Sequence, residues 1–235
     1  MPMPAAPADA SHPAGEPSVH FGSTAVPRVR LGIETISDVV FGLSLEIGSI
    51  ALVAKLPQSG ADLTSDIVEF GFSFIIIFMV WFAYRRAVVS LPHETQRTLI
   101  ANVALLFCVS IEPFLFYVLV VGSESVTGAA SVAFALDVGA MMLLLSVLYY
   151  LLLAEERNAP SGHAHPAVLR QIRVSGVGRT VVALVFFVSA LPSFAGPGIL
   201  SLTIREDVWI IALGLFFAVQ YGAPLVSRQK IPAKN

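Results

Sequence analysis

The sequence predicts an all-α polytopic membrane protein with six transmembrane helices and both termini in the cytoplasm. Three observations support this. Of the 235 residues, 56% are hydrophobic and only 13% are charged, whereas a soluble domain carries about 25% charged residues. Several separate apolar runs approach or exceed the roughly 20 residues that a spanning helix needs. The distribution of Lys and Arg along the chain then gives the orientation.

The chain divides into a tail, a helical domain and a short basic end. Residues 1–27 are rich in Pro, Ala, Gly and Ser and lack apolar periodicity, so we expect a disordered tail. Residues 28–228 should form the six-helix transmembrane domain, and residues 229–235 a C-terminal tail. The expected spans are, in chain order, 30–54, 67–84, 98–121, 129–154, 180–194 and 208–225.

The first span is unusual because polar side chains interrupt its apolar run. It contains Ser37, Asp38, Ser44 and Glu46. A charged side chain at the centre of a bilayer costs roughly 2.5–3.5 kcal/mol on insertion scales. We therefore expect this helix to face protein or water rather than lipid.

The connections between the later spans vary in length. The second span ends near Trp81 and Tyr84, whose rings we expect at the membrane interface. The short link 122–128 predicts that the third and fourth spans form an antiparallel hairpin. The longest expected connection is 155–179, which is basic at its far end.

The basic residues are distributed asymmetrically. With six spans, twelve of the fourteen Lys and Arg residues fall on one side, and only Lys55 and Arg205 fall on the other. Cytoplasmic loops carry the excess of Lys and Arg. This asymmetry predicts that both termini lie in the cytoplasm.

Three polar residues within later spans form a possible intramembrane network: Asn102, Glu112 and Asp137. Intramembrane acids are functional candidates. Glu112 precedes Pro113, whose ring removes a backbone hydrogen bond from the helix, and Asp137 could pair with an Arg or bond to Asn102. Asn102 itself is the type of residue that links helices by hydrogen bonds.

The sequence contains no recognisable catalytic or nucleic-acid-binding motif. It has no Ser-His-Asp constellation, phosphate loop or zinc-ligand spacing, and Cys108 is its single cysteine. A membrane-embedded enzyme using paired acids would lack a nucleophile or metal set. We therefore expect no enzyme activity, no cofactor, no metal site and no nucleic-acid partner.

The run Glu34–Phe41 (ETISDVVF) resembles the first-helix signature of the transmembrane protein 175 family of endosomal, lysosomal and prokaryotic potassium channels. That signature reads Arg-x-x-x-Phe-Ser-Asp, followed by small and branched apolar residues. The resemblance continues through the aromatic second span ending in Arg85-Arg86, through Leu99–Asn102 and to Pro113. A single set of six spans is similar to the prokaryotic members.

The resemblance implies a homotetramer in the cell membrane whose first helices surround a pore for monovalent cations, with potassium as the permeant ion. The family's pore-facing positions fall on Leu43, Ile47 and Ile50 here, and steps of four and three place these three on one helix face. The implied mechanism is a hydrophobic constriction that gates by narrowness and dewetting. The alternative for these aliphatic residues is ordinary packing.

Three positions differ from the family signature. Gly32 occupies the position of the motif Arg, so its tethering role is absent or passes to Arg30, and Ile36 replaces the motif Phe. Glu46 stands where the family usually carries Thr. In a tetramer it would form a ring of four carboxylates, and such rings favour cations; conduction would then be less potassium-selective or gated by protonation of Glu46.

Other interpretations remain for the polar residues. Ser37 and Asp38 could hydrogen-bond a neighbouring helix without touching an ion, and Glu46 could be a buried carboxyl paired with another span. The rival function is a proton-coupled secondary transporter that uses Glu46, Glu112 and Asp137 as a relay. Transporters often contain internal repeats, and the absence of a visible repeat counts against this alternative.

Overall fold

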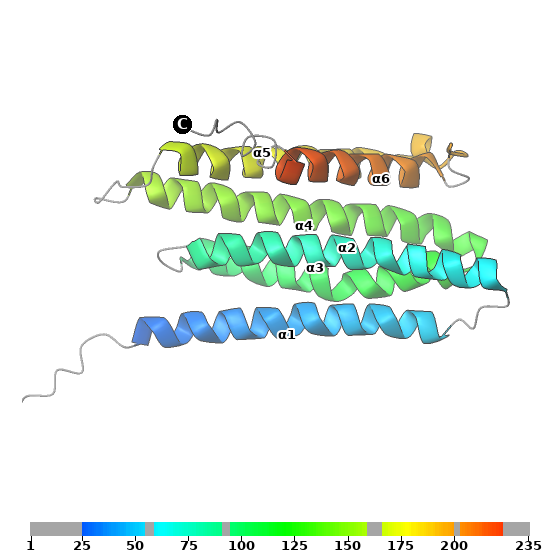
Figure 1. Cartoon of the computed structure of the whole chain (residues 1–235), viewed down its shortest axis with the longest axis horizontal. Helices are drawn as coiled ribbons and strands as arrows, with labels where there is room; N and C mark the ends of the chain where they lie inside the picture. The colour runs from blue at the N-terminus through cyan, green and yellow to red at the C-terminus, as the bar shows by residue number, and fades with distance from the viewer. Residues whose placement is uncertain (1–24, 55–58, 91–94, 159–165, 200–202, 223–235) are drawn as a thin grey trace, which may run out of the picture.

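Six long helices lying side by side make up the described part of the chain (Figure 1). The computed structural model describes residues 25–54, 59–90, 95–158, 166–199 and 203–222. The long helices are α1 (Ala25–Ala54), α2 (Gly60–Ser90), α3 (Gln96–Val121), α4 (Glu124–Asn158), α5 (Pro166–Ser189) and α6 (Ile204–Phe217). A 3₁₀ turn, η1 (Pro192–Phe194), follows α5, and a π-helical turn, η2 (Ala218–Gly222), follows α6. The prediction of an all-α chain with six helices is confirmed for the described residues, whereas the crossing of the membrane by all six stays a prediction.

The helices run across the bundle from α1 at one edge to α5 and α6 at the other (Figure 1). α1 packs on α2 and α3, while α4 packs on α2, α3 and α5 and so forms the centre. At the α4–α6 side, Trp209 lies between two rings, with centroids 5.1 Å from Phe134 and 5.8 Å from Phe186. Burial of these aromatic rings joins α4, α5 and α6 into one core.

Four of the helices are long and apolar enough to cross a membrane by length and composition. The segments are Asp62–Val88, Gln96–Val121, Ser125–Arg157 and Val168–Ser189. Large apolar side chains such as Phe107 and Phe114 are exposed on the surface of the single protomer. Together these features support a multi-pass membrane protein.

The predicted connection 155–179 is wrong, because α4 continues to Asn158 and α5 begins at Pro166. Proline suits the first helical position, where its fixed φ matches the helix and no N–H is needed. Gly176 lies inside α5, where it packs on α4. A Cβ at Gly176 would meet Tyr149 and Tyr150 at 3.6 Å, so the helices approach closely there.

The ends of other predicted segments also differ. α2 runs from Gly60 to Ser90 rather than over 67–84, and α4 runs from Glu124 to Asn158 rather than over 129–154. α6 begins at Ile204 rather than 208, because Thr203 and Glu206 form a reciprocal capping box that starts the helix. α1 begins at Ala25, inside the predicted tail 1–27. The remainder of that tail and the tail 229–235 lie outside the described residues.

Candidate functional site: the first helix and its anchor

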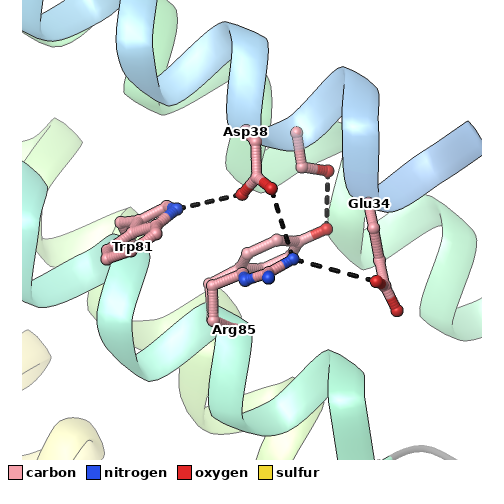
Figure 2. A network of polar contacts seen from close by, with 6 residues as sticks. Glu34, Asp38, Trp81 and Arg85 are labelled. Atoms are coloured by element: carbon pink, nitrogen blue, oxygen red, sulfur yellow. Dashed lines mark hydrogen bonds and ion pairs between the residues drawn. The ribbon is translucent and has the colours of Figure 1, made fainter. Parts of the chain in front are cut away.

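The Ser37–Asp38 pair attaches α1 to α2. The Trp81 indole N–H donates a hydrogen bond to Asp38 Oδ1 at 3.0 Å. The Arg85 guanidinium lies 3.2 Å from Asp38 Oδ2 and 3.8 Å from Glu34 Oε2, and so bridges two carboxylates on successive turns of α1. Figure 2 shows these contacts converging from α2 onto Asp38.

A second contact lies beside this ion pair and is fully buried. The Ser37 hydroxyl and the Tyr84 hydroxyl are 2.6 Å apart, and both residues have 0% exposed surface. The Asn102 side chain on α3 also hydrogen-bonds to Tyr84, so three helices meet at this hydroxyl. We call the set Glu34, Ser37, Asp38, Trp81, Tyr84 and Arg85 the α1 anchor.

The partners of the motif were missed by sequence reasoning. Trp81 and Tyr84 were expected at the membrane interface, but their polar atoms face α1, and Tyr84 is buried. Trp81, Tyr84 and Arg85 are spaced by three and one residues, which puts them on one helix face. A search of the second span for a helix face that carries a counter-ion for Asp38 could have identified these three residues.

The guanidinium that pairs with Asp38 comes from Arg85 on α2, whereas the family signature carries its Arg on the first helix, at the position of Gly32. The sequence offered Arg30 as the substitute, but the side chain of Arg30 lies outside the described residues. The guanidinium and Asp38 are both partly exposed, at 36% and 41% of their side chains. Ion pairs exposed to this degree contribute about 0–1 kcal/mol each. Their main effect is therefore to position α1 against α2 rather than to stabilise the protein strongly.

The two faces of α1 differ in their surroundings. Ser37, Phe41, Ser44 and Gly48 follow steps of four, three and four, and all are buried against neighbouring helices. The residues expected to line a pore lie on another face and remain open in the protomer. Leu43, Ile47 and Ile50 are exposed by 51%, 51% and 58%.

Glu46 is also exposed on α1. On an ideal helix it is rotated by about 60° from Leu43 and about 40° from Ile50, so it lies at one border of the exposed apolar face. Its backbone carbonyl accepts a hydrogen bond from Ser49. Within one protomer this carboxyl is not enclosed by another span, in contrast to the buried-carboxyl alternative.

The three polar residues of the later spans do not form one network. Asn102 contacts Tyr84 and so belongs beside the α1 anchor. Glu112 accepts a hydrogen bond from Ser73 Oγ at 2.8 Å. Asp137 is hydrogen-bonded to the Cys108 thiol rather than to Asn102. Glu112 and Asp137 interact electrostatically and form a separate pair inside the bundle.

The comparison with protein families agrees with the resemblance read from the sequence. Residues 33–113 match the family model described as the endosomal/lysosomal potassium channel TMEM175. The matched stretch contains the Ser37–Asp38 pair, all of its partners in the α1 anchor, and Glu112. The family resemblance is therefore confirmed. No curated protein matches the chain.

The fold is similar to that of a solved channel. The chain matches a crystal structure of a variant of the potassium channel MtTMEM175, in complex with a nanobody–MBP fusion protein, with a TM-score of 0.50 and 15% identity. The match covers 84% of this chain and 91% of that chain. The similarity therefore extends beyond the segment 33–113 to most of the six-helix bundle.

Proposed function

We propose that four copies of this chain assemble into a cation channel that conducts potassium. The proposal starts from the match of residues 33–113 to the TMEM175 family model. The first helices of the four copies surround the pore. Leu43, Ile47 and Ile50 form its hydrophobic constriction, and Glu46 contributes a ring of four carboxylates next to it. The pore is lined by side chains and has no filter of backbone carbonyls.

The observation that carries this proposal is the division of α1 into two faces. The α1 anchor holds one face against α2 and α3. A row of branched apolar side chains on another face is left exposed by about half at the edge of the bundle. Copies of the chain placed around a central axis would bring these rows together.

A ring of such side chains controls the passage of ions through the width of the pore and through the exclusion of water from it. Apolar constrictions gate by dewetting, because a narrow apolar passage does not hold the water that an ion needs. Smaller side chains would widen the passage and admit water more readily. The Glu46 ring acts in addition by attracting cations, since rings of Asp or Glu favour cation entry.

The test is single-channel recording of the purified protein in planar bilayers under bi-ionic potassium/sodium gradients. We expect unitary cation currents. Reversal near the potassium potential would make Glu46 a tolerated substitution, whereas a weak potassium preference would point to the carboxylate ring. Ile47→Ala should raise the unitary current on the order of several-fold by widening the constriction. Ile100→Ala is the matched control, because Ile100 is 61% exposed but lies on α3. Equal effects of the two substitutions, or no unitary current from active protein, would contradict the proposal.

The same recordings test the carboxylate ring. Glu46→Thr should increase the preference for potassium over sodium. Unchanged selectivity would remove Glu46 from the pore.

A proton-coupled transporter remains the second candidate, because Glu112 and Asp137 lie inside the bundle. Passive flux that scales with the driving force separates a channel from a transporter. Saturating potassium flux that stops when the proton gradient is collapsed would favour the transporter.

A further inference from the structure

A pair of acidic side chains lies in the interior of the protomer, separate from the exposed face of α1. Glu112 on α3 has 0% exposed surface. Its Oε1 accepts the Ser73 hydroxyl from α2 at 2.8 Å, but its Oε2 has no hydrogen-bond partner. On α4, Asp137 is bonded to the Cys108 thiol and its Oδ2 is likewise buried without a partner. We call Glu112 and Asp137 the acid pair.

No positive charge among the described residues balances the acid pair. The charged group that acts on Glu112 is Asp137, which has the same sign. The other partner of Asp137 is the neutral Cys108, and the contact from α2 is the neutral Ser73. α1 also packs on α3, but the charged group that acts on Glu112 among the described residues is Asp137 on α4. Two ionised carboxylates in this position would be desolvated, unpaired and mutually repelling.

Such an arrangement is energetically unfavourable without a cation or a proton. An ionised carboxylate moved from water into a dry interior costs several kcal/mol or more when it has no partner. Each orphan oxygen also lacks a hydrogen-bond donor, which costs about 1–3 kcal/mol, and more for a charged group. A positively charged hydrogen-bond donor would therefore stabilise both unpaired oxygens, Glu112 Oε2 and Asp137 Oδ2.

A metal ion fits this position poorly. Ions such as Ca²⁺ and Mg²⁺ take about six or more oxygen ligands. The acid pair and Ser73 offer few, and the described residues contain no group of three or more His, Cys, Asp or Glu arranged to hold a metal. A proton needs no coordination shell. It removes one of the two negative charges and so relieves their mutual repulsion.

We propose that the acid pair is an intramembrane proton-binding site, in which Glu112 and Asp137 together hold at least one exchangeable proton at neutral pH. Ser73 and Cys108 orient the two carboxyl groups by donating to one oxygen of each, which leaves Glu112 Oε2 and Asp137 Oδ2 to hold the proton. The site lies inside each protomer and does not depend on the proposed pore.

The sequence next to Glu112 links this site to the geometry of α3. Pro113 has no N–H and cannot donate to the carbonyl four residues earlier, so α3 lacks one backbone hydrogen bond there. A helix turn with a missing bond bends more readily than a regular one. Loss of the proton would introduce charge repulsion between α3 and α4 at this turn.

Infrared spectroscopy of the full chain in lipid nanodiscs at neutral pH tests the proposal directly. A protonated carboxylic acid has a carbonyl-stretch band that is absent from a carboxylate and shifts on exchange into heavy water. We expect Glu112→Gln and Asp137→Asn each to remove intensity from this band. Asp62→Asn is the control, and because Asp62 is exposed in the first turn of α2, it should leave the band unchanged.

Two further variants assign the proton and keep the test usable if a carboxyl substitution prevents folding. Ser73→Ala removes the hydrogen bond to Glu112 and should move the band to higher frequency if Glu112 carries the proton. Cys108→Ala should shift it if Asp137 carries the proton. Spectra that are identical in the wild-type protein and all four variants would overturn the proposal. The channel recordings have a different readout, so either proposal can fail without the other.

Discussion

At the scale of single residues, the main feature is the way Asp38 is satisfied. A carboxylate in the first span would be costly facing lipid, yet one oxygen accepts the Trp81 N–H and the other faces the Arg85 guanidinium. The Ser37–Tyr84 contact adds a buried hydrogen bond one residue away. The motif pair thus acts in the protomer as a link between helices, which was one of the two interpretations drawn from the sequence.

Asp38→Asn should lower the free energy of unfolding by about 0.5–1 kcal/mol, because the amide keeps an oxygen for the Trp81 N–H and loses the partly exposed ion pair with Arg85. Arg85→Gln should cost about 0.5–1 kcal/mol, as expected for a partly exposed ion pair. The measurement is equilibrium unfolding in mixed micelles.

The double variant should cost less than the sum of the two single variants, with a coupling of about 0.5–1 kcal/mol. Arg97→Gln provides the control, because Arg97 is exposed at the start of α3. Its effect should add to that of Asp38→Asn without coupling. Additivity in both double variants would show that Arg85 does not stabilise Asp38.

At the scale of helices, α4 and α5 are held together by close approach. A Cβ at Gly139 on α4 would lie 2.8 Å from the ring of Phe187 on α5, so the ring occupies the space that a side chain would need. Nearby, Ser146 bonds both Thr180 and the backbone carbonyl of Gly176. Small side chains with polar links are typical of helix contacts in membranes.

Gly139→Ala should therefore destabilise the protein by about 1–3 kcal/mol, the usual cost of overpacking. Gly128→Ala on the same helix is the matched control, because a Cβ there would meet nothing within 4 Å. That substitution should be neutral or stabilising by up to about 1 kcal/mol through helix propensity. Thermal unfolding of the two variants side by side compares them, and equal melting temperatures would contradict the packing argument.

At the scale of the whole molecule, the distribution of basic residues predicts the orientation in the membrane. Six spans with twelve of fourteen Lys and Arg on one side predict that both termini face the cytoplasm. Reporter fusions measure this. A fluorescent protein that matures only in the cytoplasm should be bright at either end, and alkaline phosphatase at either end should be inactive. Active phosphatase at the C-terminus would mean an odd number of spans.

The general architecture could be predicted from the sequence because it depends on apolar length and charge, which are local properties. The start of α5 could not, since Gly176 and Gly178 look like loop residues until Tyr149, Tyr150 and Phe216 are known to pack on them. The capping box at Thr203 was a local signal and could have placed the start of α6.

The candidate site was predictable only on α1. Ser37 and Asp38 stood out as polar residues in an apolar run, but their partners lie more than forty residues away, at Trp81 and Tyr84. Which of several polar residues meet depends on how the helices rotate against one another. For the same reason Asn102, Glu112 and Asp137 were grouped as one network, although the bundle separates Asn102 from the other two.

The α1 anchor also affects how the chain is made. Asp38 leaves the ribosome 43 residues before Trp81, its hydrogen-bond donor, and the guanidinium of Arg85 comes later still. During that interval the first helix enters the membrane carrying a carboxylate with neither partner, so its insertion is at its least favourable. We therefore expect integration of α1 to be completed only when the end of α2 has been synthesised, so that the first two helices enter the bilayer as a coupled unit rather than one after the other.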